Sequence, residues 1–357
     1  MSELTSILTE TTNRLLQFYV TREQQHLCVA GEWPKELWHA LEENGLTQPL
    51  VSETQGGVGA MWQDAFIIAF ASGRWQVPAP LVETIVASWL LSQAGIEIPT
   101  GPITLIDDGH KLEMSGINIS GTAHAVPWGR HASHAVAIIN SSPQLHVALI
   151  PTSKINYTSD LSMAREPRDH LDVVNVSAQL FPLTDGVDIS SIRLAGALMR
   201  SAQISGAMQA AIKMTVSYAT DREQFGRPIA KFQAIQQILA VAASKSVEAC
   251  VAAEVAFRTA DLTGGDFNKA EFDIASAKIV CSEAVETITD MSHQVHGAIG
   301  FTQEHDLHFI TQRLWTWRAE FGSETFWAER LGRKVLKRGA KNLWPDMIDR
   351  QSLVSDS

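Results

Sequence analysis

The sequence predicts an α+β protein, mainly α, in which a helical region, a β-rich region and a second helical region follow one another. Apolar residues recur at helical spacing up to about residue 97, and short β-rich runs separated by turn residues follow. Beyond residue 187 the segments are again long and helical. We therefore expect an N-terminal helical domain (1–97), a middle small antiparallel β-domain (98–187) and a C-terminal four-helix bundle (188–357). A chain of 357 residues is long enough for two or three domains.

The N-terminal region is expected to contain four helices. The first runs over 2–19, the second starts at Trp33-Pro34 and ends at Gly45, and two more run over 61–71 and 80–94. Pro34 fits because proline is accepted in the first turn of a helix. The glycine-rich segment 55–59 is interpreted as a turn between helices, because no strand precedes it and no phosphate-loop lysine follows it.

The other two regions are assigned on the same grounds. Strands are expected over 103–106, 134–139, 146–150 and 171–176. Long helices are expected over 195–220, 232–260, 267–291 and 311–337, the last one interrupted near Gly322. Gly206 is expected to be a point of close packing between helices, and such contacts favour a bundle.

The composition argues against several classes of protein. The formal net charge of −11 and the pI near 5.5 argue against a main role in binding nucleic acid or an anionic membrane surface. The three cysteines lie far apart, and His296 has no matching ligand cluster, so neither a disulfide framework nor a metal site is expected. The N-terminus lacks the pattern of a secretory signal, and no apolar run is long enough for a membrane span. We expect a cytoplasmic protein without a membrane partner.

Two segments carry most of the functional information. The first is 217–236, with the sequence SYATDREQFGRPIAKFQAIQ, and it places Arg222 and Gln224 where a long helix ends. Gly226 permits the bend there, and arginine can grip a diphosphate with its planar fork of donors. The alternative is that Arg222 contacts only helix-end carbonyls and water. The second segment is 294–302, QVHGAIGFT, in which Gly297 and Gly300 would let a flat or charged ligand approach the backbone, or would simply form a loop between helices.

Together the two segments resemble the acyl-CoA dehydrogenase family, and the resemblance covers nearly the whole chain. It implies FAD chemistry. Such enzymes desaturate an acyl-CoA thioester between its α and β carbons. A carboxylate removes the α proton, the β hydrogen leaves as hydride to flavin N5, and an electron-transfer flavoprotein accepts the electrons. The family's order of domains is the order predicted above.

The resemblance also implies which residues contact FAD, and it builds oligomerisation into the site. Arg222, Gln224 and Phe225 would contact the diphosphate and adenine side from a neighbouring subunit, with Gln233 near the adenine-ribose half. The subunit paired with it would contribute Gln294, Gly297 and Ala298. In the β-domain, Trp128 would lie beside the flavin ring, or would be a sheet-packing residue.

The sequence departs from the family at the catalytic base. Counting from Gly300-Phe301, the glutamate that many members carry before a glycine falls at Phe321, which is followed by Gly322. The second position that members use, at the start of the first long bundle helix, falls at Gly196. The base therefore stays unassigned. Glu320, one residue from the first position, is a candidate, and a solvated acidic helix surface is the other interpretation of that segment.

A second departure is the absence of the family's Thr-Glu-Pro…Gly-Ser-Asp stretch. The two departures, and the short chain, resemble members that form one half of a heteromeric enzyme, such as a heterotetramer, for bulky acyl-CoAs such as steroid side chains. One subunit supplies the base there, and the other mostly completes FAD binding. The leading interpretation is such a paired subunit without its own base. A self-sufficient homomeric dehydrogenase, a flavin oxidase or monooxygenase, and a non-catalytic scaffold that keeps the fold are the alternatives.

Overall fold

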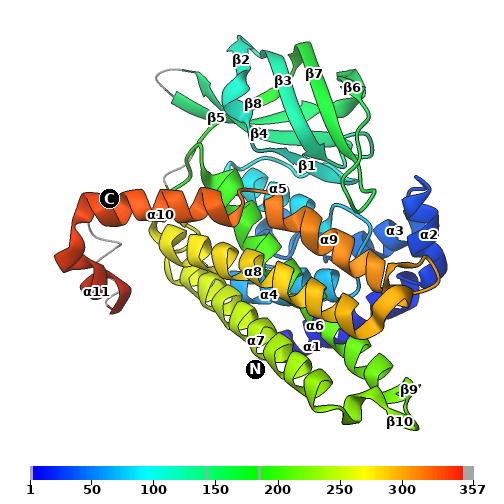
Figure 1. Ribbon diagram of the computed structural model, residues 1–357. Coiled ribbons are helices and arrows are strands. Elements are labelled where there is room, and N and C mark those ends of the chain that lie inside the picture. Colours follow the sequence, from blue (N-terminus) through cyan, green and yellow to red (C-terminus); the bar gives the residue numbers. More distant parts are fainter. Residues whose placement is uncertain (1–2, 142–143, 184–185, 349–357) are drawn as a thin grey trace.

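The computed structural model describes residues 3–141, 144–183 and 186–348. Helices, strands and helices follow one another in the predicted order (Figure 1). The N-terminal helices are α1 (Glu3–Tyr19), α2 (Arg22–Val29), α3 (Lys35–Glu43), α4 (Trp62–Arg74) and α5 (Leu81–Gln93). Four of them confirm the predicted segments. The short helix α2 was not predicted, because its mostly polar sequence has no apolar repeat, and the side chain of Thr21 caps it by accepting from the Gln24 N–H.

The β-rich region forms two four-stranded sheets. One has the order β1-β4-β5-β8, and the other has the order β2-β3-β7-β6. The strands are β1 (Ile103–Ile106), β2 (Leu112–Ser115), β3 (Asn118–Pro127), β4 (His134–Ser141), β5 (Gln144–Pro151), β6 (Asn156–Thr158), β7 (Arg168–Ser177) and β8 (Gln179–Pro182). Pairing is antiparallel except between β1 and β4.

The predicted strands correspond to β1, β4, β5 and β7, whereas β2, β3, β6 and β8 were missed. The longest of these, β3, was missed because its register shifts between Ile119 and Gly121 and again between Ala123 and Val126. Such bulges break the alternation of buried and exposed side chains on which strand prediction depends. Residues 124–127, which follow at the second bulge, line a cavity.

The C-terminal region consists of long helices. They are α6 (Ser191–Asp221), α7 (Gln233–Leu262), α8 (Phe267–His296), α9 (Leu307–Ala319), α10 (Glu324–Arg338) and α11 (Ala340–Ile348). The strands β9 (Glu223–Gln224) and β10 (Arg227–Pro228) form a small hairpin beyond α6. Short 3-10 turns are η1 (Glu53–Gln55), η2 (Gly109–Lys111), η3 (Thr152–Lys154), η4 (Ile229–Lys231) and η5 (Gly297–Phe301). The predicted interruption near Gly322 is confirmed as the break between α9 and α10, where Phe321 and Gly322 have positive φ angles of 52° and 95°.

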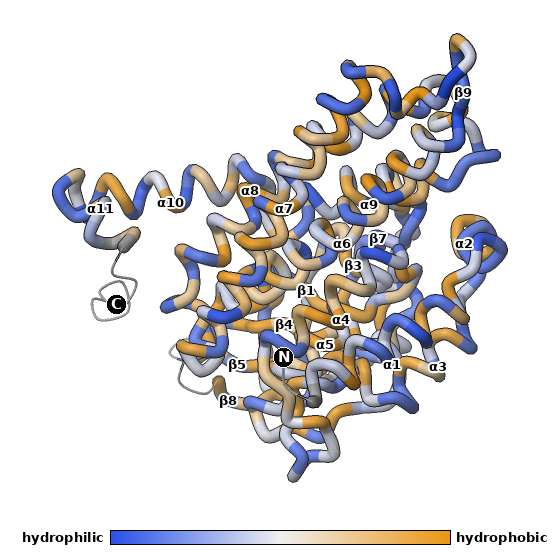
Figure 2. Tube along the Cα trace, turned by 90° about the horizontal axis from the view of Figure 1, so that it is seen from below, coloured by the Kyte–Doolittle hydropathy of each residue, from blue (hydrophilic) through white to orange (hydrophobic). Residues whose placement is uncertain are grey.

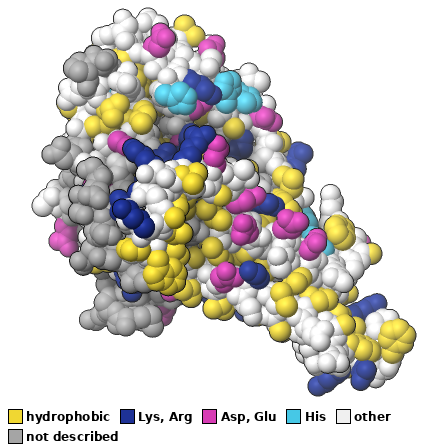
Figure 3. Space-filling model, turned by 60° about the vertical axis from the view of Figure 1, so that its left-hand side comes forward, with side chains coloured by type: hydrophobic (Ala, Val, Ile, Leu, Met, Phe, Trp, Pro, Cys, Tyr) yellow, Lys and Arg dark blue, Asp and Glu magenta, His cyan; other side chains and the backbone are white. Residues whose placement is uncertain are grey.

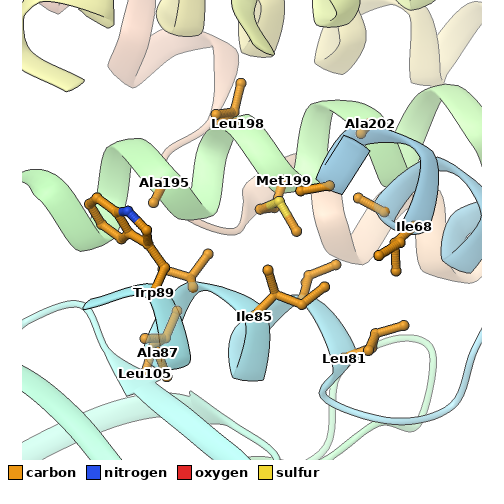
Figure 4. Packing of buried hydrophobic residues seen from close by; sticks show 14 of the residues in the cluster. Ile68, Leu81, Ile85, Ala87, Trp89, Leu105, Ala195, Leu198, Met199 and Ala202 are labelled. Carbon is orange, nitrogen blue, oxygen red and sulfur yellow. The ribbon is translucent and has the colours of Figure 1, made fainter. Parts of the chain in front are cut away.

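One apolar core joins the N-terminal helices to the bundle and to β1. Figure 4 shows Ile85 and Trp89 of α5 facing Ala195 and Met199 of α6, with Leu105 of β1 beneath them. The approach of α4 to α6 requires glycine, because a Cβ on Gly206 would overlap the backbone of α4. In Figure 2 the β9 hairpin and α11 project from this body. No helix within the described ranges is both long and apolar enough to cross a membrane.

Candidate functional site

A cavity of about 600 Å³ lies between the β-rich region and the bundle. Its walls come from the end of β1, the end of β3 (residues 124–127), the start of β7, the start of α6 and the loop 319–322 between α9 and α10. Most of the side chains that line the cavity are apolar. The charged ones are Arg168, Arg193, Asp107 and Glu320. A largely apolar cavity of this size with a few polar groups is typical of a site for a small molecule.

A buried ladder of alternating charges runs beside the cavity and ties the three regions together. In order of contact, its members are Glu83, Arg200, Glu320, Arg168, Glu166 and Arg313. Glu83 belongs to α5, Arg168 to β7 and Arg200 to α6, so each region of the chain contributes at least one charge. The three arginines and three glutamates balance one another, which is what makes their burial tolerable.

Glu320 is the centre of this ladder. One carboxylate oxygen accepts from Arg168 Nε at 2.5 Å, and the other accepts from Arg200 Nε at 2.8 Å. Burial by itself raises the pKa of Glu320, but the two guanidinium groups outweigh it and hold the pKa below its ordinary value. A carboxylate with both oxygens engaged and a lowered pKa is a poor proton acceptor. Glu320, the candidate for the catalytic base, thus lines the cavity but is held in ion pairs with two arginines.

Phe321 and Gly196, the two positions at which the resemblance would place the base, meet in space. The ring of Phe321 packs on Gly196 of α6 so closely that a Cβ on this glycine would lie less than 3.0 Å from the ring carbons. Phe321 is largely buried, and the Arg200 guanidinium lies 5.6 Å from its ring centroid. An apolar ring therefore occupies the space that a carboxylate from either position would use.

The cavity also contains charged groups that sequence reasoning missed. Arg193 Nε donates to Asp107 Oδ2 at 2.8 Å, and the other oxygen of Asp107 is enclosed without a hydrogen-bond partner among the described residues. Burial raises the pKa of Asp107, and Arg193 opposes that shift. In the sequence, Asp107 belongs to an Asp-Asp-Gly segment that is typical of a turn. No local signal could therefore have assigned Asp107 to a ligand-binding site.

Trp128 lies outside the lining of the cavity. Its buried ring packs edge-on against Trp33 of the N-terminal region, with a centroid distance of 6.1 Å. Its neighbours Val126 and Pro127 do line the cavity. The segment 126–129 thus reaches the cavity through these two residues, while Trp128 supports them from behind.

The Arg222 segment lies at the far end of α6. Arg222 follows the last residue of the helix, Gln224 lies on β9, and Phe225 at the tip is 92% exposed with a φ of 52°. The Arg222 guanidinium has no hydrogen bond or ion pair within the described part of the chain. Figure 3 shows basic side chains around apolar ones at a protruding tip of the molecule. Exposed donors beside an exposed ring form a surface ready for an anionic, partly aromatic ligand.

The second predicted segment lies at the same end of the bundle. Tyr218 of α6 stacks on His296 of α8 with a centroid distance of 4.5 Å, which holds the two helix ends together. Gln294, Gly297 and Ala298 are exposed there, and a Cβ on Gly297 would meet nothing within 4 Å. Gln233, at the start of α7, is exposed as well. All seven predicted contacts outside the β-domain are therefore solvent-accessible at one end of the bundle.

This end of the bundle and the cavity are far apart. Arg193 lies in the first turn of α6 and Arg222 directly after the last, which separates them by roughly 40 Å along the helix axis. Figure 1 shows the β9–β10 hairpin and the β-rich region at opposite ends of the molecule. A dinucleotide that touched both surfaces would have to bridge two chains.

Residues 189–336 match the family model "Acyl-CoA dehydrogenase, C-terminal domain". This range includes α6 to α9, with both segments described above. The resemblance of the chain to the acyl-CoA dehydrogenase family is therefore confirmed. Among curated members, the acyl-CoA dehydrogenase IpdE2 of Mycolicibacterium smegmatis is 27% identical over 319 residues, covering 88% of this chain and 93% of the relative. The acyl-CoA dehydrogenase IpdE2 of Mycobacterium tuberculosis is 28% identical over 302 residues, covering 79% of this chain and 80% of the relative.

Two solved structures share the fold over nearly the whole chain. The ChsE4-ChsE5 complex from Mycobacterium tuberculosis has a chain with a TM-score of 0.84 at 22% identity, covering 95% of this chain and 99% of that one. A chain of the Tcur3481-Tcur3483 steroid ACAD, in its G363A variant, gives a TM-score of 0.83 at 20% identity, with coverages of 92% and 96%. These likenesses confirm the predicted α+β architecture.

Proposed function

We propose that this chain is one subunit of a heteromeric, FAD-dependent acyl-CoA dehydrogenase that carries no carboxylate base of its own at either family position. The observation that carries the proposal is the packing of Phe321 on Gly196. A phenyl ring cannot accept a proton, and the nearest carboxylate, Glu320, is neutralised by two arginines. The carboxylate base of the complex then belongs to the partner subunit.

The residues present fit FAD. Arg222 and Gln224 offer unshared donors for the diphosphate, the open backbone at Gly297 admits close approach, and Phe225 is free to pack on the adenine side. The apolar wall formed by Val126 and Pro127 suits a flat ring. FAD, when bound, supplies the hydride acceptor for desaturation. Further contacts to FAD would come from Gln233, Gln294 and Ala298. Trp128 would affect the flavin ring only indirectly, through the apolar wall against which it packs.

The separation of roughly 40 Å between the two surfaces supports an oligomer, because one chain alone cannot present both to the same cofactor. The relatives' titles, a two-component complex and a steroid acyl-CoA dehydrogenase, favour a heteromeric assembly and a bulky or steroid-derived acyl-CoA. We propose an electron-transfer flavoprotein as the electron acceptor and a cytoplasmic location.

The test is co-expression with a second acyl-CoA dehydrogenase-like chain that carries the glutamate at the family position. The expected product is a 1:1 complex with a flavin absorbance spectrum, reduced by a bulky acyl-CoA. In that complex, replacing the partner's glutamate by glutamine lowers the rate of reduction by about 10²-fold or more, whereas Glu320→Gln in this chain lowers stability without specifically removing turnover.

Three other results would contradict the proposal. A yellow, active preparation of this chain alone that loses activity on Glu320→Gln would make it a self-sufficient homomer. Rapid consumption of oxygen in place of electron transfer to the flavoprotein would indicate an oxidase. A colourless protein in every pairing would leave a scaffold that keeps the fold.

A further inference from the structure

Three side chains that can act as proton acceptors line the cavity in its described part, and two of them are committed to other bonds. They are Asp107, His124 and Glu320. Both oxygens of Glu320 are bound by arginines, and the free oxygen of Asp107 is enclosed by protein rather than open to the cavity. His124 is exposed at the mouth of the cavity. A proton leaving a ligand in this cavity can therefore reach His124 but not the two carboxylates.

His124 is held by a chain of polar contacts that crosses the neighbouring strand. Its Nδ1 lies 3.2 Å from Nδ1 of His170 on β7, and Nε2 of His170 lies 3.5 Å from the carboxylate of Asp160. The backbone N–H of Ala125 also donates to Nδ1 of His170 at 3.4 Å. Asp160 and His170 are both partly exposed, so the chain leads from the cavity to solvent.

These contacts determine which ring nitrogens carry protons. The Asp160 carboxylate lies 3.5 Å from Nε2 of His170, and this contact favours a proton on that nitrogen. The Ala125 N–H can only donate, which independently requires a bare Nδ1 on His170. His124 must then donate from its own Nδ1, because its neighbour has no proton to give there. The remaining nitrogen of His124, Nε2, carries a lone pair, and no described residue donates to it.

We propose that His124 is the proton acceptor of this cavity, with His170 and Asp160 as its positioning residues. The inference rests on the proposed function. In the step, the Cα–H bond of a bound acyl thioester breaks, its electron pair stays on the enolate, and the proton forms the N–H bond at Nε2 of His124. The resulting imidazolium is stabilised through its hydrogen bond toward His170 and Asp160. The step needs no oxidant, and its reversal from heavy water places deuterium on the α carbon.

The experiment measures exchange of the α proton in the complex whose partner glutamate is replaced by glutamine. The partner subunit then no longer contributes to the exchange. Hexanoyl-CoA is incubated with this complex in heavy water without an electron acceptor, and α-deuterium is followed by mass spectrometry. His124→Gln is expected to lower the exchange rate by about 10²-fold or more, and Asp160→Asn by roughly tenfold. His39→Gln, at an exposed histidine of α3, is the matched control and leaves the rate unchanged.

A second measurement separates a chemical role from a structural one. Nitrogen-15 NMR of the histidine rings is expected to show a proton on Nδ1 and a bare Nε2 for His124, and a loss of that preference in Asp160→Asn. Exchange that is absent in the complex with His124 intact and the partner glutamate replaced, or that is unchanged by His124→Gln, overturns the inference, while a bound flavin leaves the proposed function standing. A complex without flavin overturns the proposed function, and a proton on Nε2 of His124 overturns the inference by itself.

Discussion

Phe321 and Gly196 form a complementary pair, because the phenyl ring lies where any side chain on Gly196 would be. The two residues are far apart in sequence and come from different elements, the α9–α10 loop and α6. The positive φ of Phe321, 52°, turns its side chain inward to this position. The pair therefore sets the shape of the cavity wall at Phe321.

Gly196→Ala is expected to destabilise the protein by about 1–3 kcal/mol, because the added methyl group overpacks a buried contact with the Phe321 ring. Urea unfolding measures the free energy of unfolding. In a Phe321→Leu background the same change costs less, since the smaller side chain makes room. The control is Gly332→Ala on α10, where a Cβ meets nothing within 4 Å and the helix gains about 0.5–1 kcal/mol. Equal effects at Gly196 and Gly332 would contradict the packing.

Glu320→Gln is expected to cost about 3–5 kcal/mol in the free energy of unfolding, because it leaves Arg168 and Arg200 buried without their shared counter-charge. Since the folded-state pKa of Glu320 is lowered, its contribution is present above the unfolded value of 4.5 and is lost as the pH falls through the folded value. The variant should therefore show a shallower loss of stability below pH 4.5. Glu248→Gln, at an exposed pair with Lys245, serves as the comparison, and matching losses for the two variants would refute the ladder's role.

Lys278 is buried in α8, where its ammonium donates to the Arg318 carbonyl and to Ser282. Burial lowers its pKa to about 7. Because the unfolded chain keeps the proton up to about pH 10.5, stability is expected to rise as the pH increases from 7 toward 10. Lys278→Met should abolish this rise, which amounts to on the order of 4 kcal/mol. Denaturation at pH 6.5 and 9.5 measures it, and an equally steep rise in the variant would show that another group is responsible.

Arg222→Gln is expected to weaken flavin retention in the co-expressed complex by about ten- to a hundredfold, because a charge-assisted contact to a diphosphate is lost. Its exposed position means that the thermal unfolding of the chain itself should not change. Arg258→Gln, an exposed arginine near the other end of α7, is the matched control. Retention is measured as flavin absorbance per complex after gel filtration, and equal retention in both variants would remove Arg222 from the cofactor site.

The sequence by itself determined the order of regions, most of the helices and both segments at the end of the bundle. These features are local: helical spacing reports burial within one element, and the 217–236 and 294–302 segments are continuous in the chain. The family resemblance placed Phe321 and Gly196 at the base positions by counting alone. It could not say that the two residues touch.

Only the tertiary structure decided the content of the cavity. Separate elements of the chain bring together Asp107, His124 and Glu320 in the cavity. The arginines that neutralise Glu320 lie 120 and 152 residues away from it in the chain. The same holds for β3, because its bulges hide its strand pattern and its residues 124–127 line the cavity. The ring contact of His124 also depends on the tertiary structure, because β7 brings His170 beside it from 46 positions away in the chain.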